Sequence, residues 1–386
     1  MPDTIAEATE TAPAATAQKR RRTTRYRGHG SQVFIYLGKL FRMFVFQNDW
    51  KVLPMAAVIA ALVAMVMQYG FFVTKEGTMM GSFAFACVCI WNGCFNSIQV
   101  ICRERSIVKR EHRSGMHVFS YIAAHMIYQA FLCLCQTVLL IYVSQLVGVK
   151  YPSKGLFCDF FLLEYGVTIF LITYASDMLS LFISSFARNT TVSMTIMPFI
   201  LIFQLVFSGG IFTLPEQAKP VARATVSSYG LKAINVEADY NHLPSVVAWN
   251  TLFNMRNNQM HFAVKNADLL RFLRSGILRE QTKAAELLPG YTLADLIDAL
   301  ATDESAAEFR DVEIPFDFRI QDIIDVVGED TLRNLILRET VTATQKPEYE
   351  ATQTNLLVNW LWLALYALLF AFLSMVSLKF IDKDKR

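Results

Sequence analysis

Charge is missing from five long stretches of this 386-residue chain. The shortest of them runs for 23 residues without Asp, Glu, Lys or Arg. About 20 apolar residues span the hydrocarbon core of a bilayer, so each stretch is long enough to cross a membrane. The whole chain is only 18% charged, against about 25% in soluble domains, which excludes an ordinary soluble fold. The stretches are residues 52–74, 77–102, 114–149, 189–215 and 351–378.

A sixth stretch, residues 156–186, contains three acidic residues but still predicts a spanning helix. The segment YGVTIFLITYAS between two of the acids is apolar and long. Asp159 and Glu164 fall near one end of this span, where we expect them to be solvated, whereas Asp177 falls inside it. The sequence therefore predicts an all-α integral membrane protein with six transmembrane helices.

Cysteine is absent from the acidic segment at residues 214–354. All seven cysteines lie between Cys87 and Cys158, inside or at the ends of apolar stretches. The acidic segment therefore has no disulfides and must be held by its own packing. The CxC spacings at 87/89 and 133/135 are typical of small apolar residues in a helix, and we favour that interpretation over metal or redox chemistry.

Signatures of catalysis are also missing. The chain contains no GxxxxGK[ST] phosphate loop, no HExxH zinc helix and no GxSxG nucleophile turn. We therefore expect this chain to have no enzymatic activity and to hold no cofactor or metal.

The charges that are present divide the chain between two sides of a membrane. Residues 214–354 hold 14 Lys and Arg against 21 Asp and Glu, a net charge of −7, while the remainder carries +10. This division favours two membrane faces over a nucleic-acid partner. Basic residues cluster before the first span, after the second and at the C-terminus, and the positive-inside rule places them in the cytoplasm. We predict a multi-pass protein of the plasma membrane with both termini cytoplasmic and residues 214–354 extracytoplasmic.

The loop after the second span, residues 103–116, reads RERSIVKREHRSGM. This dense, mixed-charge helix is suited to docking on a soluble partner through ion pairs, although a solvated loop that only obeys the positive-inside rule would look similar. Glu104 and Glu111 are seven residues apart and share one helical face. That spacing suits packing along a neighbouring helix, here residues 31–48 and a helix from a soluble partner.

The same loop resembles a signature of the G-subfamily of ABC transporters, the white and pleiotropic-drug-resistance group of the ABC type-2 permeases. Val108 stands where an aromatic residue is common in that family, but other positions match: Glu104, Arg105, Lys109, Arg110, Glu111 and Gly115. The resemblance implies that the loop is a coupling helix that contacts an ATPase subunit. The docking residues would be Arg103, Glu104, Arg105, Lys109, Arg110, Glu111, Arg113 and Gly115.

A second stretch, residues 181–221, is similar to another motif of the family. The matching residues are Arg188, Pro198, Gln204, Ser208 and Gly209. The segment SSYGLKAINV resembles, more weakly, a segment that re-enters the outer leaflet in that family. Three features depart from the family: the chain carries no ATPase, its loop before the last span is much longer, and Asp177 stands where residues are usually small or apolar.

These patterns divide the chain into parts. Residues 250–354 show amphipathic helical patterns, with Thr292 and Asp295 spaced as a capping box. The predicted parts are a disordered basic tail (1–30), an amphipathic connecting helix (31–50), five spans with the coupling loop (51–213), a re-entrant segment (214–249), a helical extracytoplasmic subdomain (250–354), and a last span with a cytoplasmic tail (355–386).

Residues within the spans are candidates for a substrate path. The resemblance implies that the second and fifth spans line a substrate cavity at a dimer interface, whereas ordinary helix packing is the alternative. Asp177 is costly inside a span, and it could bind a cationic substrate, pair with a cation, or sit protonated against a carbonyl. For the stripe of His125, Gln129 and Gln136 we favour packing. The candidates are Asn92, Asn96, Gln99, Phe199, Phe203, Phe207 and Asp177.

The resemblance implies a permease subunit of an ATP-driven exporter of an amphipathic or hydrophobic compound. Its expected partners are a separately encoded ATPase, a second copy of itself or a related permease, and the lipid bilayer. The alternative is a non-transporting membrane assembly that relays force or signal from a cytoplasmic ATPase to the extracytoplasmic subdomain. An intramembrane enzyme that uses His125, Asp177 or Glu164 is disfavoured, because no paired motif accompanies these residues.

Overall fold

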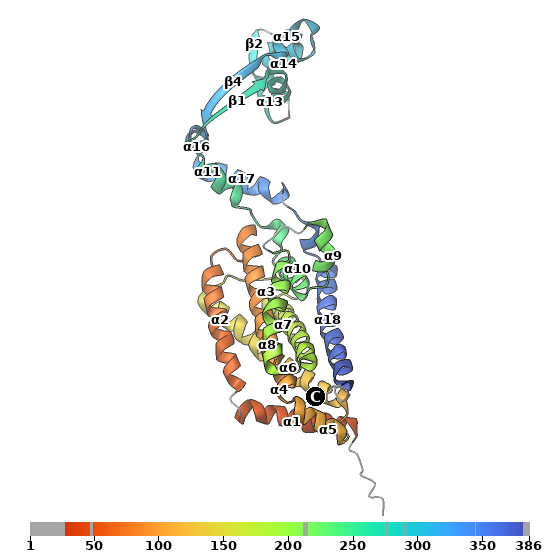
Figure 1. The fold of residues 1–386 in the computed structure, drawn as a ribbon. Coiled ribbons are helices and arrows are strands. Elements are labelled where there is room, and N and C mark those ends of the chain that lie inside the picture. The colour runs from red at the N-terminus through yellow and green to blue at the C-terminus, as the bar shows by residue number, and fades with distance from the viewer. Residues whose placement is uncertain are drawn as a thin grey trace, which may run out of the picture.

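The computed structural model describes residues 28–46, 49–210, 215–274, 276–288, 290–343 and 345–380. They form a helical bundle and an elongated insertion that projects from one end of it (Figure 1). Nearly all of the predicted basic tail, the end of the predicted fifth span and residues 381–386 lie outside the described residues.

Five segments of the described chain are long and apolar enough to cross a membrane, and the prediction of an all-α membrane protein is confirmed. The first contains η1 (Asp49–Lys51) and α2 (Val52–Met67), and the second contains α3 (Lys75–Ser97) and α4 (Val100–Arg103). The other three are α6 (Val118–Val147), α7 (Phe161–Phe186) and α18 (Gln353–Lys379).

The predicted fifth span corresponds to a shorter helix, α8 (Thr190–Val206). Asn189 caps its start, where the side chain accepts a hydrogen bond from Val192 N at 2.8 Å. A helix of 17 residues is about 25 Å long, slightly less than the hydrocarbon core of about 30 Å. The described residues thus contain five full-length spans and one shorter apolar helix, so the predicted count of six is not established by length.

The predicted amphipathic helix is present as α1 (His29–Phe46), which lies across one end of the bundle (Figure 1). Its buried residue, Leu40, packs against Ala124 and Tyr128 of α6. The short helix α5 (Arg105–Arg113) and the last described residues of α18 lie at the same end. This arrangement places both ends of the described chain on one side of the bundle and the insertion on the other.

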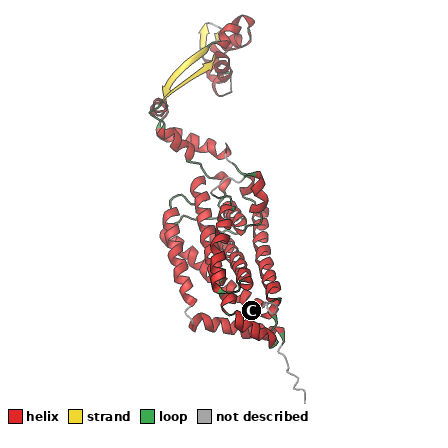
Figure 2. Ribbon diagram, in the orientation of Figure 1, coloured by secondary structure: helices red, strands yellow, loops and turns green. Residues whose placement is uncertain are grey.

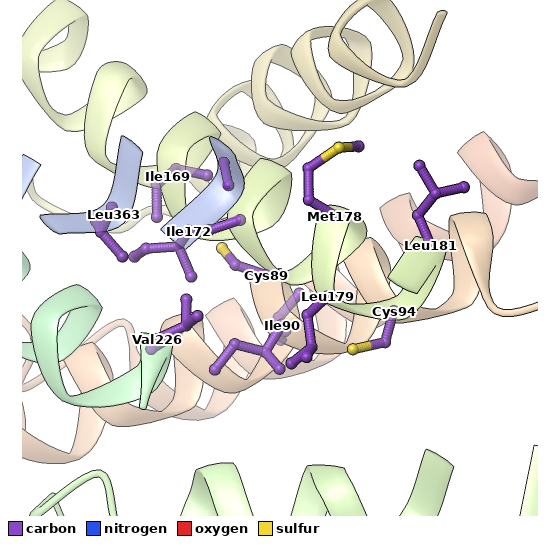
Figure 3. Packing of buried hydrophobic residues seen from close by; sticks show 14 of the residues in the cluster. Cys89, Ile90, Cys94, Ile169, Ile172, Met178, Leu179, Leu181, Val226 and Leu363 are labelled. Carbon is purple, nitrogen blue, oxygen red and sulfur yellow. The ribbon is translucent and has the colours of Figure 1, made fainter. Parts of the chain in front are cut away.

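The core of the bundle lies where α3 and α7 cross. Gly93 of α3 allows a close approach, because a Cβ atom there would lie 2.2 Å from the carbonyl oxygen of Thr173. Figure 3 shows the apolar side chains around this contact, which come from α3, α7, α18 and α10 (Val226–Glu237). The labelled members are Cys89, Ile90, Cys94, Ile169, Ile172, Met178, Leu179, Leu181, Val226 and Leu363.

The helix α10 closes the bundle at the end opposite α5 (Figure 1). It packs against α3, α7 and α18, and nearly all of its residues are buried. Gln204, one of the residues that match the second family motif, holds the start of α10, because Ser227 N donates to Gln204 Oε1 at 3.1 Å. Ser82 Oγ of α3 donates to Asn235 Oδ1 at 2.9 Å further along.

The expected solvation of Glu164 is wrong. Its side chain is buried, with 2% of the residue exposed, and accepts hydrogen bonds from the backbone of Leu156 and Phe157, both at 3.1 Å. The preceding loop folds over the carboxylate, and its two N–H groups give the buried Glu164 the hydrogen-bond donors that it needs away from water. Asp159, in the same loop, is exposed as expected.

The insertion consists of a helical stalk, a two-stranded ribbon and a distal head (Figure 1). The stalk contains α11 (Val247–Asn254), α16 (Ile320–Val327) and α17 (Glu329–Ala343). The head contains α12 (Asn266–Leu273), α13 (Gly276–Ala284), α14 (Leu293–Thr302), α15 (Ala307–Asp311) and the short strands β2 (Glu286–Leu288) and β3 (Tyr291–Thr292). The predicted capping box at Thr292 and Asp295 is present. The remaining short helices are α9 (Lys219–Ala222), η2 (Glu216–Ala218), η3 (Tyr240–His242), η4 (Glu304–Ala306) and η5 (Pro347–Tyr349).

The sequence pattern predicted only helices for residues 250–354, whereas the structure also has a two-stranded ribbon there. Strands β1 (Gln259–Lys265) and β4 (Glu313–Arg319) pair antiparallel, with Lys265 opposite Glu313 (Figure 2). The segment EIPFDFR alternates polar and apolar residues, which is a strand pattern rather than a helix pattern. Pro315 is tolerated because both strands of a two-stranded ribbon are edges.

Hydrogen bonds clamp the base of the insertion to the first turn of α3. Lys75 is almost fully buried, and its Nζ donates to the carbonyl oxygen of Val341 in α17 at 3.0 Å. The Glu76 carboxylate accepts from Ser245 Oγ and from Val246 N, the latter at 3.2 Å. Both chain segments that enter and leave the insertion are therefore attached to one transmembrane helix.

We expect Glu76→Ala to loosen this clamp. Removing an acceptor of hydrogen bonds to a charged group costs about 1.5–3 kcal/mol, so the Val246 amide should exchange its hydrogen about tenfold faster or more. Hydrogen–deuterium exchange of the purified chain measures this, with Glu308→Ala in the exposed α15 as the matched control. Equal exchange at Val246 in Glu76→Ala and in the unaltered chain would contradict the clamp.

Candidate functional site

The predicted coupling helix, α5, is fixed to the bundle by contacts on its inner side. Val108, at the position where the resembled family often has an aromatic residue, is 1% exposed and belongs to the main core. Arg105 donates from one terminal nitrogen to the carbonyl oxygens of Ser185 at 2.9 Å and Ala187 at 3.0 Å. A cation suits these carbonyls, which end α7. Gly115 follows α5 with φ of +102°, a conformation that favours glycine.

The two glutamates spaced by seven residues both face α1. Lys39 Nζ lies 2.9 Å from Glu104 Oε2, and the Tyr36 hydroxyl donates to Glu111 Oε2 at 3.1 Å. Burial, together with the charge of Glu111, raises the pKa of Tyr36 far above its usual value, so this hydroxyl remains a donor. The predicted packing of the loop along the 31–48 helix is therefore present, and α1 already engages these two carboxylates.

The outer side of α5 faces solvent. Arg110, Arg113 and Ser106 are exposed, and Ile107 among them is 38% exposed. Arg103, at the end of α4, is exposed next to them, while Lys109 is partly buried. The surface is therefore basic with one apolar residue at its centre. Of the predicted docking residues, Arg103, Arg110 and Arg113 are exposed, whereas Glu104, Glu111 and Arg105 contact the rest of the bundle.

A second group of predicted residues forms a polar cluster inside the bundle. Asp177 of α7 is fully buried, and its carboxylate accepts hydrogen bonds from Ser97 Oγ of α3 and from Cys133 Sγ of α6, the latter at 3.3 Å. Gln129 Nε2 also donates to Ser97 Oγ at 2.7 Å. The cluster therefore joins three membrane helices.

Asn96 belongs to the same cluster. Its side-chain amide and that of Gln136 exchange two hydrogen bonds, at 2.9 and 3.0 Å. Asn96 Nδ2 also lies 3.8 Å from Cys133 Sγ, which connects this pair to Asp177. Within the described part of the chain, Asp177 has no ion pair, and a role in binding a cationic substrate remains a prediction.

Sequence reasoning missed part of this cluster. Cys133 was interpreted only as a small apolar residue, and Ser97 was not selected at all. A signal existed, because Gln129, Cys133 and Gln136 stand at i, i+4 and i+7 and therefore share one face of α6. The structure confirms packing for that stripe, since His125, Gln129 and Gln136 are all buried within the bundle.

The other path candidates lie in different places. Asn96, Gln99 and Arg103 line a hollow of about 240 Å³ between α1, α3, α4, α6 and α8. Phe199 and Phe203 are instead exposed on the outer surface of α8, with the Phe203 and Phe207 rings 4.9 Å apart. Asn92 is buried in α3. The predicted path residues are thus divided among a hollow, a buried cluster and an exposed aromatic surface.

A family model described as ABC-2 type transporter matches residues 20–234, which is more than half of the chain. The matched range runs through α1, α5 and α8 and ends within α10, before the insertion begins. Its description covers the ABC-2 type as a whole, and the closer resemblance to the G-subfamily rests on the residues quoted above. No curated protein matches the chain significantly.

We expect Asp177→Leu to destabilise the bundle and Asp177→Asn to be tolerated. Leucine leaves Ser97 Oγ and Cys133 Sγ without their acceptor, which costs about 1–3 kcal/mol, whereas asparagine keeps one carbonyl oxygen. Thermal unfolding of the purified chain measures the difference, with Asp159→Leu in the exposed loop as the control.

Transport assays then separate structure from substrate binding. If Asp177 binds a cationic substrate, Asp177→Asn should keep its protein level and lose transport of cations. Unchanged cation transport by Asp177→Asn would show that Asp177 has a packing role and no role in binding a cation.

Proposed function

Because the chain belongs to the ABC-2 type transporter family, we propose that it is the membrane-spanning permease subunit of an exporter driven by a separately encoded ATPase. The chain is a multi-pass membrane permease component of an ABC transporter. The observation that carries the finer proposal is α5, which is anchored firmly on its inner side and presents a basic surface on its outer side.

The outer surface of α5 suits docking on an ATPase. A basic surface favours an acidic groove, and attraction between exposed charges speeds encounter and weakens as salt is added. Ile107, exposed at the centre of this surface, supplies an apolar contact. The ATPase would bind ATP and Mg, and this chain would supply no catalytic group.

Movement of α5 would be transmitted into the membrane by α3. The segment Lys75–Arg103 is helical over nearly all its length and leads directly into α5. The predicted path residues Asn96 and Gln99 line the hollow beside its inner end. Displacement of α3 would therefore change the lining of that hollow.

A second copy of the chain, or a related permease, would cover the exposed aromatic surface. Phe199 of α8 is 72% exposed, and Trp91 and Phe95 of α3 are exposed with their rings stacked 6.1 Å apart. Large aromatic side chains are favourable contacts at protein interfaces. A path enclosed between two such surfaces would accept an amphipathic or hydrophobic compound.

The clamp on α3 favours a second candidate function. Since Lys75 and Glu76 attach the insertion to the outer end of the helix that leads to α5, force on α5 could also move the insertion. In that case the protein would relay force without transport. Reconstitution with its ATPase in vesicles separates the two, because only a transporter moves a compound across the bilayer.

Docking is tested by reversing charge on the outer surface of α5. We expect Arg110→Glu with Arg113→Glu to leave the chain inserted and to lower recruitment of the ATPase in pull-down assays by about tenfold or more, since losing charged interface partners costs about 2–5 kcal/mol. Arg223→Glu, an exposed site outside α5, is the matched control.

Reversal of Glu104 and Glu111 to Lys is also expected to lower recruitment, but through loss of the contacts to Lys39 and Tyr36 of α1. Unchanged pull-down and unchanged substrate-stimulated hydrolysis after both sets of reversals would reject α5 as the docking helix.

Orientation is tested with single cysteines. Ser106 lies on α5 and Ser305 in the head, and both are exposed. Cys158 is the only exposed native cysteine, so a Cys158→Ser background keeps Cys133 and the buried cluster intact. With an impermeant thiol reagent on intact cells, we expect Ser305→Cys to react and Ser106→Cys to react only after the cells are opened. The reverse pattern would reject cytoplasmic termini.

A further inference from the structure

The distal head contains a hollow that lies apart from α5 and from the predicted path residues. It lies between α12, α13, α14 and α15 and has a volume of about 640 Å³. Four of its seven lining residues are arginines. The lining residues are Ala267, Leu270, Arg271, Arg274, Arg279, Ala301 and Arg310.

The lining of the hollow is basic, whereas the segment that contains it is acidic. Residues 214–354 carry 21 acidic and 14 basic residues, a net charge of −7. Six of those basic residues lie between residues 265 and 310, and four of the six line this one hollow. A concentration of arginine in one concave place is therefore a local feature and does not follow from the composition of the segment.

Carboxylates fix three of the guanidinium groups in position. Asp298 of α14 lies between two arginines, with Arg274 Nε 2.9 Å from Oδ1 and Arg279 3.4 Å from Oδ2. Arg271 lies 3.2 Å from Asp268 on the same helix, and its side chain is 83% exposed. A single carboxylate thus serves two arginines, and the third pair is open to solvent.

Arg310 is held without a carboxylate. One of its terminal nitrogens donates to the carbonyl oxygens of Leu300, Ala301 and Asp303, at 3.3, 3.0 and 2.9 Å. These carbonyls end α14, where a cation is favoured. The guanidinium is therefore fixed in place by backbone carbonyl groups and not by a hydrogen-bonded carboxylate of the described residues.

The hollow keeps an excess of positive charge. Asp303 interacts with Arg310 by charge, and hydrogen bonds from Ser305, with a smaller contribution from the charge of Arg310, hold the pKa of Asp303 below its usual value. Asp303 therefore stays ionised at neutral pH. Within the described part of the head, three carboxylates, those of Asp268, Asp298 and Asp303, interact with the four guanidinium groups. Among the contacts of the described residues, Arg274 uses only Nε and Arg310 only one terminal nitrogen, so further N–H donors are left for a ligand.

We propose that this hollow binds the phosphate group of an extracytoplasmic ligand, either a soluble phosphate compound or a lipid headgroup. The planar guanidinium presents N–H donors in a fork that matches phosphate oxygens and keeps its charge at every physiological pH. The small and apolar residues Ala267, Leu270 and Ala301 leave room for the carbon skeleton that carries the phosphate. The assignment needs no ATPase and no transport, so it stands or falls separately from the proposed function.

Binding is measured directly on the purified full chain in phosphatidylcholine nanodiscs. Inorganic phosphate and pyrophosphate are titrated in one arm by calorimetry, and vesicles of phosphatidic acid with phosphatidylcholine are tested against vesicles of phosphatidylcholine alone in the other. Saturable binding in the first arm identifies a soluble ligand class, and binding confined to phosphatidic acid vesicles identifies a lipid headgroup. Absence of binding in both arms would overturn the proposal.

Variants locate the binding. Arg271→Gln removes an exposed guanidinium whose one ion pair is with the adjacent Asp268, so the head should fold normally, and we expect affinity to fall about tenfold. Arg271→Gln combined with Arg274→Gln should abolish binding. Arg333→Gln on α17, which removes the same charge from the stalk, should bind like the unaltered chain.

The control also guards against a nonspecific effect of net charge. An equal loss of affinity in Arg333→Gln and Arg271→Gln would show that net charge alone attracts the ligand and would overturn the assignment. Thermal unfolding midpoints equal to that of the unaltered chain confirm that Arg271→Gln tests binding and not folding.

Discussion

The close contact between α3 and α7 is the constraint on which the rest of the bundle depends. At Gly93 the two helices approach so closely that even a methyl group would overlap the Thr173 carbonyl. In a membrane, helix association is not driven by the hydrophobic effect, so such packing and interhelical hydrogen bonds carry it. The approach also brings Ser97 within reach of Asp177, so that the buried carboxylate gains a hydrogen-bond donor in addition to Cys133. Packing and polar pairing therefore support each other at one place.

The helix α3 is packed against α7 in its middle and makes further contacts at both of its ends. The outer end carries Lys75 and Glu76, which hold the insertion, and the inner end leads through α4 into α5. Only the turn at residues 98–99, α4 and Glu104 separate α3 from α5, so no long loop lies between them. Both candidate functions therefore use the same helix.

The sequence predicted features that depend on neighbours along the chain and missed those that depend on neighbours in space. Spans follow from the absence of charge, and the contact of Glu104 and Glu111 with α1 follows from their seven-residue spacing. The burial of Glu164 depends on a loop that folds back over it, which no local pattern encodes. The partners of Asp177 come from two other helices, so the sequence could mark the residue as unusual but could not choose between a substrate site and a packed cluster.

The insertion projects from the bundle and contains no cysteine, so disulfides cannot hold its parts together. Its ribbon strands have seven residues each and so span about 24 Å, which separates the head from the stalk by that length. A ligand held by Arg271 and Arg274 would therefore lie far from the predicted path residues Asn96 and Gln99. A site at such a distance can influence the bundle only through the stalk, which meets α3 at Lys75 and Glu76. The placement of that clamp on α3, rather than on a peripheral helix such as α2, connects the head mechanically to the helix that reaches α5.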